Sequence, residues 1–186
     1  MRLLDIETCL VIGAIWAAAA HFTAAFDVFF AVSFFLAAFF LFMASSLTEK
    51  RGTGLITAAT AGLLSIHTAS IAGPSAYKLI FFVAVGLAFE AFYTAKKEGW
   101  PLLGALAATA LAPTFLWALS GAPSPIGMLI DLTLMALLTG LAGCAAGLLI
   151  WNYAAQTKAV IKFQCYGATG ELRKLIRKKR PRKRFY

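Results

Sequence analysis

Residues 51–93 read RGTGLITAATAGLLSIHTASIAGPSAYKLIFFVAVGLAFEAFY, and the other segments of the chain can be arranged around this stretch. Two apolar segments flank a short polar hinge at residues 72–75, and each is long enough to cross a bilayer as a helix, which takes about 20 apolar residues. Basic pairs stand at its two ends, Lys50 with Arg51 and Lys96 with Lys97. The stretch therefore predicts a helical hairpin with both basic pairs on one side of a membrane.

The composition is that of a membrane protein. Hydrophobic residues make up 61% of the 186 positions and charged residues only 13%, and the mean hydropathy is +0.80. Soluble domains are nearly half apolar and about a quarter charged. Within the apolar segments, apolar and polar residues do not alternate as they do in the strands of a membrane barrel. Helices are therefore the structure that we expect, because every backbone N–H in lipid must be hydrogen-bonded within the protein.

Six membrane-spanning helices are predicted, at about residues 9–26, 28–47, 53–71, 77–94, 101–120 and 127–152. With the N-terminus inside, the inner segments hold most of the basic residues, and the outer turns hold only Lys78. By the positive-inside rule, both termini are expected in the cytoplasm. We therefore expect a multi-pass cell-membrane protein, with an all-α membrane domain at residues 1–157 and a basic cytoplasmic tail at residues 158–186.

The tail ends in ELRKLIRKKRPRKRFY. Such a basic cluster beside a span is attracted to anionic lipid, by about 1 kcal/mol for each basic residue near the surface. A topology anchor with lipid contact is the main interpretation, and contact with a cytoplasmic partner or ribosomal RNA is the alternative. The tail contains no recognisable nucleic-acid-binding fold, so no nucleic-acid partner is expected.

A ligand pocket is predicted near the outer ends of the spans. Ionisable groups are costly inside a membrane, so each is a candidate functional residue. The predicted ligand-binding residues fall at one outer level although they are far apart in sequence: His67, Trp117, Asp131, His21, Asp27 and Tyr77. Ordinary interfacial roles remain open for Asp27, Lys78 and Asp131, and Trp117 could be an interfacial anchor. Glu90 lies near the inner side, where we expect it to serve helix packing or coupling to a partner.

Catalysis and metal binding are not predicted. Cys9, Cys144 and Cys165 lack metal-ligand spacing, and buried structural roles are expected for the first two. No HExxH or similar short ligand motif is present, and no nucleophile–base arrangement can be identified. We therefore expect no enzyme activity, no cofactor and no metal.

Small residues recur at intervals of three or four in the first and last spans. Ala14 and Ala18 are such a pair, and Gly140, Gly143 and Gly147 repeat the pattern. Small residues at this spacing let another helix approach closely. Internal packing explains one such face, and the Ala14 and Ala18 face is predicted to dock a partner protein.

The chain resembles the substrate-binding S components of energy-coupling factor (ECF) transporters. Length, six spans, cytoplasmic termini and an alanine-rich first helix fit that family. Several motifs look like the RpG…G…GlgaE pattern of the hydroxymethylpyrimidine/thiamine type: Arg51 and Gly52, Thr57, Ala61 and Gly62, Gly73 and Pro74, and GLAFE at residues 86–90. This chain departs from the pattern in its longer basic tail and in lacking a proline before Gly52.

The resemblance implies a subunit that captures a small water-soluble vitamin or vitamin precursor near the outer face. It implies docking through the first helix onto an ECF T component that is driven by two ATPase subunits. The chain has no GxxxxGK[ST] motif, so the energy would come from those partners. An aromatic pocket with carboxylates would suit a cationic heterocycle such as thiamine. A membrane enzyme acting on lipid or isoprenoid and a non-catalytic membrane assembly factor are the alternatives.

Overall fold

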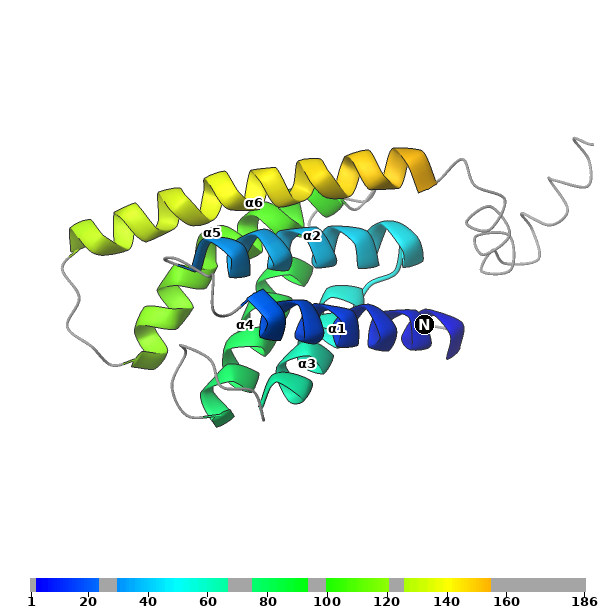
Figure 1. The fold of residues 1–186 in the computed structure, drawn as a ribbon, viewed down its shortest axis with the longest axis horizontal. Coiled ribbons are helices and arrows are strands. Elements are labelled where there is room, and N and C mark those ends of the chain that lie inside the picture. The colour runs from blue at the N-terminus through cyan, green and yellow to red at the C-terminus, as the bar shows by residue number, and fades with distance from the viewer. Residues whose placement is uncertain (1–2, 24–29, 67–74, 94–99, 121–125, 155–186) are drawn as a thin grey trace, which may run out of the picture.

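The computed structural model describes residues 3–23, 30–66, 75–93, 100–120 and 126–154, and within these ranges it contains six helices and no strand (Figure 1). The helices are α1 (Leu3–Thr23), α2 (Ala31–Thr48), α3 (Thr53–Ser65), α4 (Ser75–Tyr93), α5 (Pro101–Ser120) and α6 (Ile126–Ala154). The predicted all-helical fold class is confirmed for this part of the chain.

Four of these helices, α1, α2, α5 and α6, are long and apolar enough to cross a membrane. In contrast, α3 has only 13 residues. At 1.5 Å per residue it is about 20 Å long, against about 30 Å of hydrocarbon core. The predicted third span continues to residue 71, but residues 67–71 lie outside the described ranges. By length and composition, this is a helical membrane protein.

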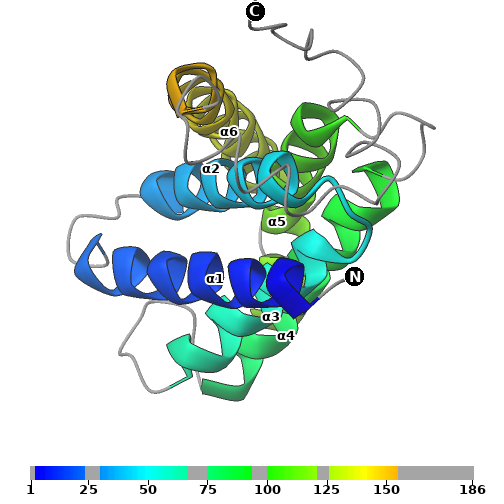
Figure 2. The ribbon, with the colours of Figure 1, turned by 90° about the vertical axis from the view of Figure 1, so that its right-hand side faces the viewer.

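Helix α2 is the central helix of the bundle. It packs against α1, α3, α5 and α6, while α4 packs between α3 and α5. Figure 2 shows α2 between α1 on one side and α6 on the other. The start of α1, the turn from α2 to α3 and the end of α6 lie toward the same end of the bundle in Figure 1. We call this end, which carries the exposed Lys50 and Arg51, the basic end, and the opposite one the far end.

The glycines of α6 pack inside the bundle. A Cβ added to Gly143 would meet the backbone carbonyl oxygen of Phe35 and the Ala38 methyl group on α2. Gly147 faces the ring of Phe42 in the same way, and Gly140 faces Thr109 of α5. Because there is no side chain at these positions, the helix backbones approach closely. The glycine face of α6 therefore serves internal packing.

Helix α1 buries a different face from the one predicted to dock a partner. Its buried residues include Cys9, Gly13 and Trp16. Ala14 is half-buried at the edge of this face, and Ala18 is exposed. Docking through Ala14 and Ala18 stays a prediction.

Candidate functional site

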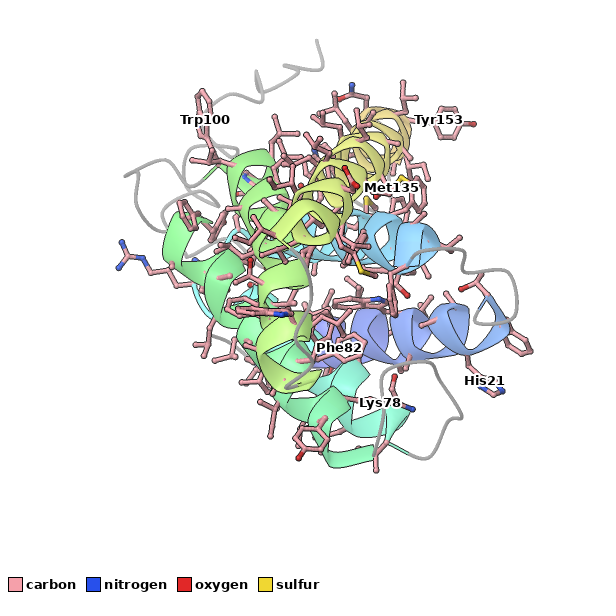
Figure 3. The ribbon with its side chains drawn as sticks, turned by 90° about the vertical axis from the view of Figure 1, so that its left-hand side faces the viewer. His21, Lys78, Phe82, Trp100, Met135 and Tyr153 are labelled. Atoms are coloured by element: carbon pink, nitrogen blue, oxygen red, sulfur yellow. The ribbon has the colours of Figure 1, made fainter. Side chains whose placement is uncertain are left out.

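The predicted pocket residues are spread around the far end. His21, Tyr77, Trp117 and Asp131 belong to α1, α4, α5 and α6 respectively, and all four are exposed. His67 and Asp27 lie outside the described residues. In Figure 3, which looks onto the far end, His21 lies at the periphery and apart from Lys78. The four described side chains are therefore at the surface of the chain, and their predicted role in ligand binding is untested.

Lys78 is a buried ionisable residue near the far end, with 4% of its surface exposed. Its Nζ donates a hydrogen bond of 3.4 Å to the backbone carbonyl of Ser65, the last residue of α3. A cation is favourable at a helix C-terminus, where the carbonyl groups carry partial negative charge. Lys78 was predicted at this depth but not among the ligand-binding residues. The sequence feature that could have singled out Lys78 is its position as the one lysine or arginine between the two basic pairs.

Glu90 lies at the opposite end of α3. Its Oε1 accepts a hydrogen bond of 2.7 Å from the backbone N–H of Gly54, in the first turn of α3. Gly52, just before the helix, has a φ of 86°, a left-handed conformation that glycine adopts without a Cβ penalty. A carboxylate is favourable at a helix N-terminus because the N–H groups there carry partial positive charge. The predicted role of Glu90, in helix packing or in coupling to a partner, stays a prediction.

Together, Lys78 and Glu90 contact the two ends of α3. The two residues are nearly as far apart along α4 as Ser65 and Gly54 are along α3, since helices share one rise per residue. The positive charge meets the C-terminal end of α3 and the negative charge meets its N-terminal end. Helix α4 thus holds the short α3 by charges that match its macrodipole.

Several polar side chains gather where α1, α2 and α3 meet near the basic end. Thr48 and Thr53 are buried, and their hydroxyl oxygens are 2.7 Å apart. Thr53 also donates to the Lys50 carbonyl at 2.6 Å. The Cys9 thiol lies near the Thr53 and Thr57 side chains, and close enough to Asp5 and Glu90 to interact electrostatically. This cluster was not predicted from the sequence, because its members come from separate helices that only the fold brings together.

The cluster is not arranged as a metal site. In the part of the chain that the structure describes, no group of three or more His, Cys, Asp and Glu side chains could hold a metal ion. Its carboxylates and hydroxyls can hold the helices together and can hydrogen-bond a small polar molecule.

No protein-family model, curated protein or solved structure matches this chain. The resemblance to S components therefore depends on the sequence alone, that is, on the motifs of residues 51–90 and on the number and composition of the predicted spans.

Proposed function

We propose that this chain is the solute-capturing membrane subunit of an uptake transporter of the ECF kind. It would bind a small water-soluble, vitamin-like molecule at the far end and release it after docking on a T component with two ATPase subunits. The sequence pattern of residues 51–90 supports the family, and the geometry around Lys78 supports a solute site.

The observation that carries the proposal is a buried lysine against the end of α3, which has 13 residues as described. Short or interrupted helices that end within the membrane point to substrate sites in transporters, where helix ends interact with the solute. An ionisable residue at such a depth is a functional candidate by default. Ser65 and Lys78 provide a carbonyl and an ammonium group at this position. The predicted ligand residues His67 and Tyr77 are their near neighbours in sequence.

The proposal includes six spans with both termini in the cytoplasm. Single cysteines at Lys50 and Ile126 test it, because both positions are exposed and they belong to the basic end and the far end. In intact cells, a membrane-impermeant thiol reagent should label Ile126→Cys and spare Lys50→Cys until the cells are opened. Thr48 is a poor probe position because its side chain is buried. If only Lys50→Cys is labelled in intact cells, the orientation is the opposite of the one proposed.

Ligand binding is tested with purified protein. Small molecules that co-purify are identified by mass spectrometry, and the affinity of the identified compound is measured by calorimetry. Loss of a charged partner in a desolvated site costs a few kcal/mol, or on the order of a hundredfold in affinity. We expect losses of that order for Lys78→Gln, His67→Ala and Asp131→Asn.

Glu90→Gln is the matched control, since this residue lies at the other end of α3. It should leave the affinity nearly unchanged and reduce transport. Thermal melting of each variant separates a lost contact from a lost fold. A preparation that neither carries nor binds a small molecule would contradict the proposed function, and loss of binding in Glu90→Gln alone would place the site at the basic end.

A further inference from the structure

The contact between α1 and α3 is unusually polar. Thr53, Thr57 and Thr60 follow one another along α3 at intervals of four and three residues. On α1, Asp5, Cys9 and Gly13 follow one another at intervals of four. Cys9 contacts Thr53 and Thr57, and a Cβ added to Gly13 would lie 2.6 Å from the Thr57 carbonyl oxygen and 2.7 Å from the Thr60 Cβ. These six residues form what we call the α1–α3 seam.

Thr57 differs from the other buried helical threonines that the structure describes. Threonine hydroxyls in helices commonly bond to the carbonyl four residues earlier, as Thr60 does to Ile56 at 2.8 Å and Thr133 does to Leu129 at 2.8 Å. The Thr57 hydroxyl is fully buried, and within the described ranges it has no hydrogen-bond partner beyond the weakly polar Cys9 thiol beside it. A buried hydroxyl left without a strong partner destabilises the folded state. The hydroxyl is therefore aimed into the seam, away from its own helix.

We propose that the α1–α3 seam is an internal water-binding site that is reached from the basic end. Buried water is held where two to four polar groups converge. Thr57, Thr53 and Cys9 provide such groups, and the Asp5 carboxylate lies one helical turn nearer the basic end on α1. Small and polar side chains also give α1 little apolar area to bury here, so the seam opens at a lower cost than the rest of the bundle.

Two buried cysteines form a natural pair for testing this site. Cys9 and Cys144 are both fully buried. Cys9 lies in the seam, whereas Cys144 lies on the buried face of α6 that also carries Gly140 and Gly143. Within the described part of the chain, no charged or hydroxyl side chain acts on the Cys144 thiol.

The experiment measures how fast a charged, water-soluble methanethiosulfonate reagent modifies each thiol. One protein keeps Cys9 (Cys144→Ala, Cys165→Ser) and the other keeps Cys144 (Cys9→Ala, Cys165→Ser). We expect Cys9 to react about tenfold faster than Cys144, or more, because a locally opened state is more populated than the globally unfolded state. Exposure by global unfolding alone would give both thiols one rate, and equal rates would therefore overturn the proposal.

A substitution at Thr57 supplies the second readout. Thr57→Val keeps the shape of the side chain and removes its hydroxyl, so it should lower the Cys9 rate several-fold and leave the Cys144 rate unchanged. Thr60→Val is the matched control, because the Thr60 hydroxyl is already satisfied by the Ile56 carbonyl. An unchanged Cys9 rate in Thr57→Val would remove Thr57 from the site and overturn the proposal. Neither readout depends on a transported solute, so the proposed function is tested separately.

Discussion

Replacing Gly143 with leucine should destabilise the bundle by about 3 kcal/mol or more, at the upper end of what overpacking of a closely packed site costs. Even a methyl group at this position meets the backbone carbonyl of Phe35 and the Ala38 side chain. A backbone group cannot turn aside as a flexible side chain can, so α6 must move away from α2. Since α2 is the central helix, the loss should be global. Unfolding in a denaturing detergent, followed by tryptophan fluorescence, measures it.

Gly127→Leu is the matched control for this substitution. Gly127 lies in the first turn of the same helix, and a Cβ added there would meet nothing within 4 Å. Its free energy of unfolding should stay within about 0.5 kcal/mol of that of the parent protein, as is usual for surface positions. A Gly143→Leu protein as stable as Gly127→Leu would show that α6 does not pack on α2 through its glycines.

The sequence predicted the helices better than their ends. The sixth span was expected at about residues 127–152, and α6 covers Ile126–Ala154. The first span was expected to begin at about residue 9, whereas α1 begins at Leu3. Hydropathy shows that a segment tolerates lipid, and it does not show where the backbone hydrogen bonds stop. A local pattern also cannot reveal a contact from another helix, such as that of Lys78 with the Ser65 carbonyl.

Depth in the membrane could be estimated from the sequence, but the direction of each side chain could not. His21, Trp117 and Lys78 were all placed at the outer level, yet the first two are exposed and Lys78 is buried. In a soluble helix, the polar face identifies the outside. Here lipid is as apolar as the interior, so the helices are apolar all round and the buried side has no strong signature. Lys78 could be recognised as buried only once α3 and α4 were placed together.

Exchanging the two charged residues of α4 gives the second large effect. Lys78→Glu and Glu90→Lys are each expected to cost about 3 kcal/mol, because a charge at a partly buried helix end contributes up to about 2 kcal/mol and reversal turns this gain into a penalty. Each reversal would put a charge against the α3 terminus of the same sign: a carboxylate at the Ser65 carbonyl, or an ammonium at the Gly54 N–H. The free energy of unfolding is measured as for Gly143→Leu.

The double variant shows which partner each charge has. If Lys78 and Glu90 stabilised the protein mainly by attracting each other, exchanging them would restore the pair and most of the stability. About 18 Å separates them along α4 at 1.5 Å per residue, whereas Glu90 lies 2.7 Å from the Gly54 nitrogen. The exchanged protein should therefore lose roughly the sum of the two single losses, as independent sites do. Glu7→Lys, an exposed reversal on α1, should cost little. Recovery of stability in the exchanged protein would show that the two charged residues stabilise each other. It would refute the interpretation that they stabilise the two ends of α3.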